Sequence, residues 1–163
     1  MIDAETRALA ERVLGACRAR GWTLATAESC TGGLVAGALT EIAGSSDVVD
    51  RGFVTYSNAA KMEMLGVLDA TLAEFGAVSR QTAEAMSKGA LERAGVDLTV
   101  SITGIAGPAG GSAEKPVGLM HFTAAAKGGR LIHREKRYGD LRRSEIRRLS
   151  VIEALSMLLE LAA

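Results

Sequence analysis

The segment from Thr26 to Gly33 gathers residue types that nucleophilic chemistry needs. It reads Thr-Ala-Glu-Ser-Cys-Thr-Gly-Gly, so Glu28, Ser29 and Cys30 are consecutive. The apolar run Trp22–Ala25 before it indicates a buried strand, and apolar residues at helical spacing follow it. A strand-to-helix turn of this kind can present a nucleophile above a sheet and direct backbone N–H groups at an anion. The alternative interpretation is structural, with a Ser or Thr cap and glycines for tight packing.

Lys61 is the best candidate for a general base acting on Ser29. The run Val48–Tyr56 indicates a second strand, and a helix with Asn58 as its N-cap is predicted to follow. Lys61 then lies about one turn into this helix, while Tyr56 ends the strand. Both can reach Ser29 if the two strands are neighbours. A Ser–Lys pair works only if the pKa of the lysine is lowered, and a solvated surface lysine is the alternative.

Cys30 is a rival nucleophile. With Glu28 and Lys61 it would form a Glu–Lys–Cys set similar to that of nitrilases, although a buried, inert thiol fits the pattern equally well. The histidines are weaker candidates, because His121 and His133 fall in a predicted hairpin. Neither has a His, Cys or carboxylate partner at metal-ligand spacing, so we expect no metal and no cofactor.

Hydrophobic periodicity predicts alternating helices and strands. The predicted helices are Ala4–Arg20, Leu34–Ala43, Asn58–Leu65, Thr71–Phe75, Ser79–Ala94 and a last helix from about Ser144. The predicted strands are Trp22–Ala25, Val48–Tyr56, Leu98–Thr103, Val117–Ala125 and Leu131–Tyr138. This order predicts an α/β protein, a three-layer α/β/α sandwich with a mixed, mainly parallel sheet of about five strands, in which residues 1–163 form one domain.

Polar residues close the first three predicted strands. They are Ser29, the group Tyr56-Ser57-Asn58, and Thr103-Gly104. Ligands of such folds bind at the carboxyl ends of parallel strands, so these groups are expected to converge on one crevice. The glycine-rich loop Gly104–Gly111 would add backbone N–H groups for an oxyanion or a phosphate.

Composition excludes several classes of protein. The formal net charge is zero and charged residues make up 23%, which argues against a general binder of nucleic acid or of membrane surfaces. Two cysteines, Cys17 and Cys30, make neither a disulfide framework nor a zinc site, and Cys17 is predicted to pack in the core. No targeting or membrane-spanning segment is evident, so we expect a cytoplasmic protein, and its Ala- and Met-rich composition suggests a homo-oligomer.

Arginines gather near the predicted start of the last helix. Arg142 and Arg143 could bind a phosphate through their guanidinium groups. A cation at this end of a helix has an unfavourable interaction of about 0.3–1 kcal/mol with the helix dipole. A solvated basic face is the alternative interpretation. Neither a Walker pattern nor a dinucleotide fingerprint is present.

Together these motifs resemble those of the CinA C-terminal domain family, over nearly the whole chain. The matching segments are Thr26-Ala-Glu-Ser-Cys-Thr-Gly-Gly33, Gly52-Phe-Val-Thr-Tyr-Ser-Asn58 with Lys61, Gly76-Ala-Val-Ser79, Thr103-Gly-Ile-Ala-Gly-Pro108, Gly110-Gly111 and Lys115-Pro-Val-Gly118. Stand-alone members are nicotinamide-nucleotide amidases. The resemblance therefore implies conversion of nicotinamide mononucleotide and water to nicotinate mononucleotide and ammonia.

Carried onto this sequence, the resemblance implies Ser29 as nucleophile and Lys61 as its base, with Tyr56 assisting. It also implies that Thr103 and two glycine amides surround the oxyanion and the substrate. The full predicted binding set is Cys30, Thr31, Gly32, Gly33, Ser57, Asn58, Thr103, Gly104 and Arg143.

The family's Gly-Asp-Arg motif, followed by an Arg four residues on, is changed in this sequence. Two extra residues separate Gly139-Asp140 from the best match, Arg143 and Arg147, so Arg142 is an alternative phosphate ligand. A second hypothesis is a non-catalytic module of the competence- and damage-inducible type, which senses a nucleotide or binds a protein. The intact set of predicted catalytic side chains argues against that second hypothesis.

Overall fold

Helices and strands alternate through most of the chain in the computed structural model, which describes residues 2–163. In order they are α1 (Ala4–Arg20), β1 (Leu24–Glu28), α2 (Leu34–Thr40), the 3-10 turn η1 (Ser45–Asp47), β2 (Val49–Val54), α3 (Asn58–Leu65), α4 (Asp69–Phe75), α5 (Arg80–Ala94), β3 (Leu98–Gly104), β4 (Leu119–Ala126), β5 (Leu131–Arg137) and α6 (Arg143–Ala162).

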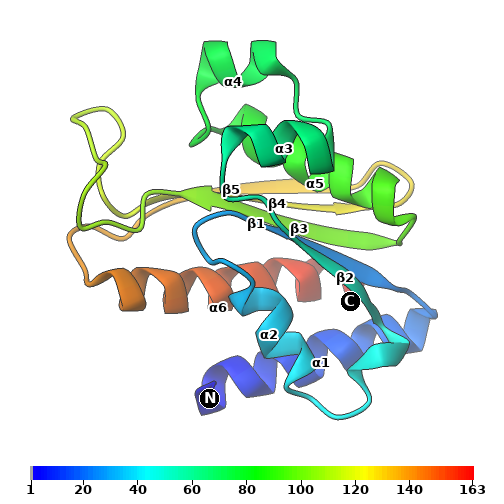
Figure 1. Cartoon of the computed structure of the whole chain (residues 1–163). Helices are drawn as coiled ribbons and strands as arrows, with labels where there is room; N and C mark the ends of the chain where they lie inside the picture. The colour runs from blue at the N-terminus through cyan, green and yellow to red at the C-terminus, as the bar shows by residue number, and fades with distance from the viewer. Residues whose placement is uncertain (1) are drawn as a thin grey trace.

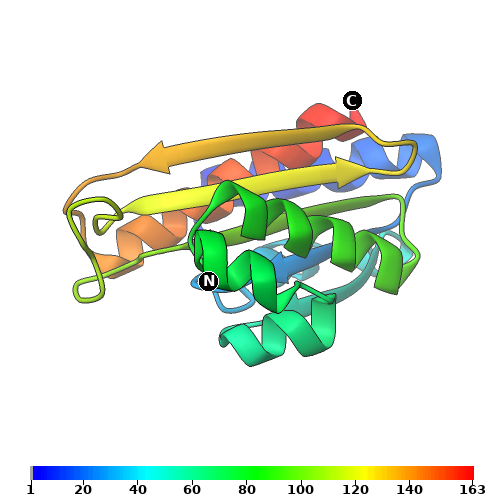
Figure 2. The ribbon, with the colours of Figure 1, turned by 90° about the horizontal axis from the view of Figure 1, so that it is seen from above.

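The strands form one mixed sheet between two layers of helices. Their spatial order is β2-β1-β3-β4-β5. β1 is parallel to both β2 and β3, whereas β3–β4 and β4–β5 are antiparallel pairs. Helices α1, α2 and α6 cover one face, and α3, α4 and α5 lie on the other (Figures 1 and 2). The predicted three-layer α/β/α sandwich with a mixed sheet of five strands is confirmed.

The two faces of the sheet are packed differently. The larger apolar cluster lies under α1 and α6 and includes Cys17, as predicted from its position in α1. Towards α5 the contacts are partly polar. The Ser101 hydroxyl donates to the Ala83 carbonyl at 2.6 Å, and the hydroxyls of Ser87 and Thr99 lie 2.9 Å apart. These bonds fix the position of α5 along β3, because each buried hydroxyl requires a partner.

Two predicted boundaries near the site were wrong. β1 runs from Leu24 to Glu28, later than the predicted Trp22–Ala25, and all five of its residues are buried. A central strand with helices on both faces has no solvent side, so the polar Glu28 in it was mistaken for turn sequence. At α3, the N-cap is Ser57 and not Asn58, since the Ser57 hydroxyl accepts from the Ala60 N–H at 3.0 Å.

His121 and His133 are neighbours across the β4–β5 hairpin, a pairing that their sequence spacing did not predict. Nδ1 of His121 lies 3.1 Å from Nε2 of His133, and burial lowers the pKa of His121 to about 4. Among residues 2–163, no three His, Cys, Asp or Glu side chains are grouped so that they could hold a metal ion. The described part of the chain also contains no helix with the length and apolar character needed to span a membrane.

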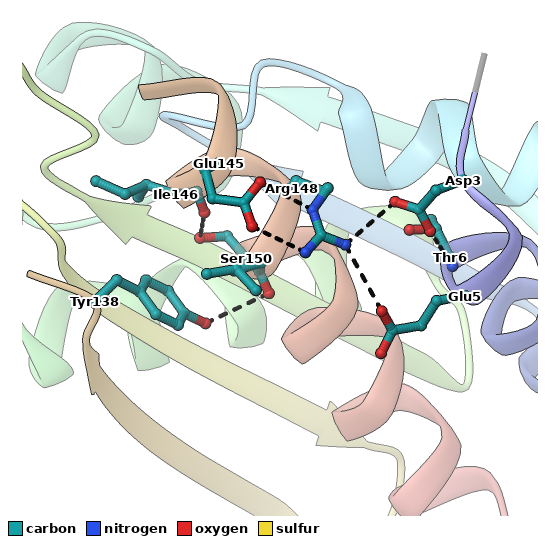
Figure 3. Close-up of polar contacts among 9 residues, drawn as sticks. Asp3, Glu5, Thr6, Tyr138, Glu145, Ile146, Arg148 and Ser150 are labelled. Atoms are coloured by element: carbon teal, nitrogen blue, oxygen red, sulfur yellow. Dashed lines mark hydrogen bonds and ion pairs between the residues drawn. The ribbon is translucent and has the colours of Figure 1, made fainter. Parts of the chain in front are cut away.

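The N-terminal ends of α1 and α6 are joined by ion pairs around Arg148 (Figure 3). Its guanidinium lies 3.3 Å from Asp3, 3.7 Å from Glu5 and 2.9 Å from Glu145. These side chains are about half exposed, and surface pairs of this kind contribute little to stability. The apolar packing between α1 and α6 therefore dominates this contact.

Gly89 determines how closely α5 approaches α3, the helix that carries Lys61. A Cβ atom at Gly89 would lie only 1.9 Å from the backbone oxygen of Leu65, the last residue of α3. No side chain larger than hydrogen fits there without moving one of the two helices. The placement of Lys61 therefore depends on this glycine.

We expect Gly89→Ala to lower the free energy of unfolding by roughly 1–3 kcal/mol, as overpacking does, although alanine is the better helix former. Gly15→Ala is the matched control, since a Cβ at this position in α1 meets nothing within 4 Å. It should raise the free energy of unfolding by about 0.5–1 kcal/mol. Urea denaturation of the two variants measures both effects, and equal stabilisation by both would contradict the close approach.

Candidate active site

The carboxyl ends of the three parallel strands meet at one edge of the sheet. Glu28 ends β1, opposite Val54 of β2 and Ile102 of β3. The next residue, Ser29, donates its N–H to the Ile102 carbonyl at 3.0 Å, and the Thr55 N–H donates to the Glu28 carbonyl at 2.9 Å. Ser29 therefore follows the middle strand of the three, with polar groups available from both sides.

Lys61 reaches Ser29 from the neighbouring strand connection. Its Nζ lies 3.1 Å from the Ser29 Oγ, 3.0 Å from the Thr55 carbonyl oxygen and 3.3 Å from the Tyr56 carbonyl oxygen. The Lys61 side chain is only 1% exposed, because α3 begins at the end of β2 and turns this residue into the crevice. The structure thus brings together the predicted nucleophile and its predicted base.

The surroundings of the Lys61 amine favour its neutral form. Burial lowers the pKa of Lys61, while the Cys30 side chain opposes the shift as a weaker influence. Lys61 makes no ion pair with any residue between 2 and 163. A neutral amine has two N–H donors and one lone pair. In the neutral form, the Thr55 and Tyr56 carbonyls can take the two donors, which leaves the lone pair for the Ser29 hydroxyl.

The alternative Glu–Lys–Cys set is not assembled. Burial raises the pKa of the Cys30 thiol to about 11, which keeps it protonated at neutral pH. The Glu28 carboxylate instead accepts from the N–H groups of Val35 and Ala36, at 2.9 and 3.1 Å, and from the Thr26 hydroxyl at 3.3 Å. Glu28 therefore satisfies the free N–H groups at the start of α2 and does not act on a nucleophile.

A pocket of about 260 Å³ opens over Ser29 and Lys61. Of the predicted residues, its lining contains Ser29, Cys30, Tyr56, Asn58, Lys61, Thr103, Gly104 and Arg143. Four other predicted residues, Thr31, Gly32, Gly33 and Ser57, do not line it. Residues that are close in sequence to Ser29 or Lys61 therefore do not all contact the pocket.

The four residues outside the pocket shape the loops around it. Gly32 donates its N–H to the Ser29 carbonyl at 3.0 Å, so this amide is not available to an oxyanion as predicted. Gly33 is the N-cap of α2, with a φ of 98° that favours glycine. The Thr31 hydroxyl is buried and has no partner among the described residues, and Ser57 caps α3.

The pocket also contains residues outside the predicted binding set, most of them in the glycine-rich loop Gly104–Gly111 that was predicted to reach the site. Ala77 and Val78 come from the segment before α5, while Ile105, Ala106, Gly107, Ala109 and Gly110 come from the loop after β3. The length and glycine content of that loop signalled a role in the site, but small apolar residues carry no chemical signal of their own. The Thr103 hydroxyl donates to the Ala77 carbonyl at 2.7 Å, so Thr103 holds this wall of the pocket and its proton is not free for an oxyanion.

Arg142 and Arg143, near the start of α6, differ in position and contacts. Arg143 lines the pocket and donates to the Gly107 carbonyl at 2.8 Å and to the Tyr56 hydroxyl at 3.0 Å. The Tyr56 hydroxyl is therefore hydrogen-bonded to Arg143. The hydrogen bond between Tyr56 and Lys61 involves the Tyr56 backbone carbonyl and not its phenol. Arg142 is the N-cap of α6 and does not line the pocket.

Comparison with known proteins assigns the chain to a family. Residues 6–162 match the model of the CinA C-terminal domain. The chain belongs to the CinA C-terminal domain family. A relative named nicotinamide-nucleotide amidohydrolase PncC, from Escherichia coli K12, is 52% identical over 159 residues, which are 97% of this chain and 95% of the relative. A CinA-like protein from a Synechococcus strain is 51% identical over 95% of this chain but only 37% of its own length.

Solved structures of CinA-family proteins share this fold. The competence/damage inducible protein CihA from Agrobacterium tumefaciens is 56% identical in sequence. Its structure matches with a TM-score of 0.98, and the match covers 100% of this chain and 99% of that one. A CinA superfamily protein from Klebsiella pneumoniae is 38% identical with a TM-score of 0.91, covering 96% and 97%. The fold is therefore that of the family across its whole length.

A second hollow in this CinA-family domain, of about 340 Å³, lies between α1, α2 and α6. Its charged side chains, Asp3 and Arg148, are paired with one another in the cluster of Figure 3. It holds neither a nucleophile beside a base nor an unpaired buried charge. The chemistry therefore points to the smaller pocket above Ser29.

We expect Glu28→Gln to lower the free energy of unfolding by about 1–3 kcal/mol. The glutamine NH₂ group would face a backbone N–H of α2, leaving one buried donor without an acceptor. Glu11→Gln on the exposed side of α1 is the control and should change stability by less than about 0.5 kcal/mol. Thermal or urea unfolding measures the difference, and an unchanged Glu28→Gln protein would contradict the capping role.

Proposed function

We propose that the chain hydrolyses the carboxamide of nicotinamide mononucleotide, releasing nicotinate mononucleotide and ammonia. Support comes from the relatives named nicotinamide-nucleotide amidohydrolase, which are 52% identical over most of the chain. The observation that carries the mechanism is the contact of 3.1 Å between the buried Lys61 Nζ and the Ser29 Oγ. A hydroxyl becomes a nucleophile when a base within hydrogen-bonding distance accepts its proton.

In the first half of the reaction, neutral Lys61 takes the proton of Ser29 as the Oγ attacks the carboxamide carbon. The C=O π bond opens, and its electron pair moves onto the oxygen to give a tetrahedral oxyanion. Protonated Lys61 then donates to the amide nitrogen as the C–N bond breaks. Ammonia leaves, and the nicotinoyl group stays on Ser29 as an ester.

In the second half, water hydrolyses this ester. Lys61 is neutral again and accepts a proton from the water, whose oxygen attacks the ester carbon. Collapse of the second tetrahedral oxyanion breaks the bond to the Ser29 Oγ, which recovers its proton from Lys61. The carboxylic acid product gives its proton to solvent and leaves as nicotinate mononucleotide, and both side chains regain their starting protonation states.

Backbone N–H groups after Ser29 are the best donors for the oxyanion. The N–H groups of Cys30 and Thr31 have no hydrogen-bond acceptor among residues 2–163, and Cys30 lines the pocket beside Ser29. The amide that follows a nucleophile is the usual donor in a strand-to-helix turn. We assign Cys30 this role through its backbone, which needs no reactive thiol.

Arg143 suits the phosphate of the nucleotide. It is the arginine that lines the pocket, and a guanidinium can bind phosphate oxygens through two donors at once. Its present partners, the Gly107 carbonyl and the Tyr56 hydroxyl, are neutral acceptors that an anionic phosphate can replace. Tyr56 and Asn58 complete the rim of the pocket on the α3 side.

Ammonia release from nicotinamide mononucleotide, measured in the presence of a chelator, tests the nucleophile. Ser29→Ala should reduce turnover at least about 10³-fold, because the ester cannot form. Cys30→Ala removes the neighbouring thiol but keeps the backbone N–H, and should retain activity. Loss of activity in Cys30→Ala alone would make the thiol the nucleophile. Nucleotide binding by the wild-type protein without turnover would instead favour the sensing module.

The acid side of the pH–rate profile should report Lys61. The base acts in its neutral form, so the rate rises with pH until Lys61 is deprotonated, and burial moves this rise below the ordinary lysine range. Lys61→Arg should be inactive, since an arginine stays protonated. Lys88→Arg, on the exposed side of α5, is the control and should keep both the rate and the profile. A profile unchanged in Lys61→Arg would remove Lys61 as the base.

A further inference from the structure

Arg147 holds two successive peptide groups of the turn that carries Ser29. Its Nε donates to the Cys30 carbonyl at 3.1 Å and its Nη2 donates to the Thr31 carbonyl at 3.3 Å. The bonds join α6 to the turn across 117 and 116 positions of sequence. No carboxylate pairs with Arg147 in the described residues, so its charge acts on these carbonyls. Hydrogen bonds from an ionised donor are stronger than those between neutral groups.

These bonds determine where the N–H groups of the turn point. In a planar trans peptide, each C=O and the N–H that follows it point in opposite directions. With the Thr31 carbonyl on Arg147, the Gly32 N–H points away from Arg147, and there it donates to the Ser29 carbonyl at 3.0 Å. With the Ser29 carbonyl fixed by Gly32, the Cys30 N–H points the opposite way. Arg147 thus determines the direction of the Cys30 N–H through one intermediate hydrogen bond.

The Thr31 N–H is oriented more directly. It belongs to the same peptide as the Cys30 carbonyl, which accepts from Arg147, so this N–H is directed away from the guanidinium. Both unpaired N–H groups after the nucleophile therefore depend on one side chain. Arg147 does not line the pocket, whereas Arg143, one turn earlier on α6, does.

We propose that Arg147 is a positioning residue that orients the oxyanion-binding N–H group of Cys30, together with the adjacent N–H group of Thr31. This inference rests on the proposed amidase function. Its guanidinium also withdraws electron density from the two carbonyls, which strengthens their peptide N–H groups as donors. The oxyanion exists only in the transition state and the tetrahedral intermediates, so loss of Arg147 reduces kcat and leaves substrate binding nearly unchanged.

The competing role is a direct contact with the substrate phosphate, as proposed for Arg143. The two roles have opposite kinetic signatures. A phosphate ligand binds substrate and transition state alike, so its loss raises KM. A group that organises the oxyanion donors lowers kcat with KM nearly constant.

The test is steady-state kinetics of ammonia release from nicotinamide mononucleotide, with Arg147→Met, Arg147→Lys, Arg143→Met and Arg148→Met compared with wild type. Arg147→Met should lower kcat about 10²-fold, the cost of one oxyanion donor in other enzymes, with KM within about twofold. Arg147→Lys should lie between Arg147→Met and wild type, because a lysine can hold one carbonyl but not both in the same geometry. Arg148→Met is the matched control on α6 and should keep wild-type kcat, since Arg148 forms ion pairs with Asp3, Glu5 and Glu145 and does not line the pocket over Ser29.

Each outcome of these kinetics supports or overturns the positioning role of Arg147. A kcat for Arg147→Met equal to that of Arg148→Met overturns the positioning role, and so does a rise in KM without a fall in kcat, the result expected for Arg143→Met. If the lost folded fraction of Arg147→Met accounts for its whole loss of kcat, and Arg147→Lys restores folding and kcat together to wild-type values, the role is structural and the inference is wrong. Wild-type protein that releases no ammonia overturns the proposed amidase function itself, and the inference about Arg147 fails with it.

Discussion

The contact between the Lys61 amine and the Ser29 hydroxyl is the interaction on which the rest of the structure depends. Lys61 is 1% exposed and pairs with no carboxylate among residues 2–163, and burial lowers its pKa, which favours the neutral amine. The carbonyls of Thr55 and Tyr56 hold that amine by its two donors, and its lone pair is left for Ser29. In the proposed mechanism, burial thus favours the form of Lys61 that can accept a proton from Ser29.

This geometry needs two parallel strands side by side. β1 delivers Ser29 and β2 leads into α3, which delivers Lys61, so the register of the strand pair fixes the distance between nucleophile and base. α3 is held in turn by the close approach of α5 at Gly89. β1 lies between β2 and β3 and α3 packs on α5, so Ser29 and Lys61 are each held by neighbouring elements.

The turn after Ser29 is held from two sides by charged side chains. Glu28 accepts the first N–H groups of α2, and Arg147 of α6 donates to the carbonyls of Cys30 and Thr31. Glycine at positions 32 and 33 allows the left-handed backbone that brings the chain from the strand into α2. The N–H groups of Cys30 and Thr31 then remain without a partner among residues 2–163. Side chains from two other parts of the chain therefore hold the loop that begins at the proposed nucleophile.

The sequence by itself determined the layers of the fold, the family, and the pairing of Ser29 with Lys61. Hydrophobic periodicity identifies helices and strands locally, and the motif around Ser29 is compact enough to be read from a few residues. Only the tertiary structure decided which groups Glu28, Gly32, Arg143 and Arg147 contact. A carboxylate that caps a helix has the same sequence signature as a catalytic one, and only the backbone shows which donors it meets. The contacts of Arg147 span more than a hundred positions, and no local pattern can encode them.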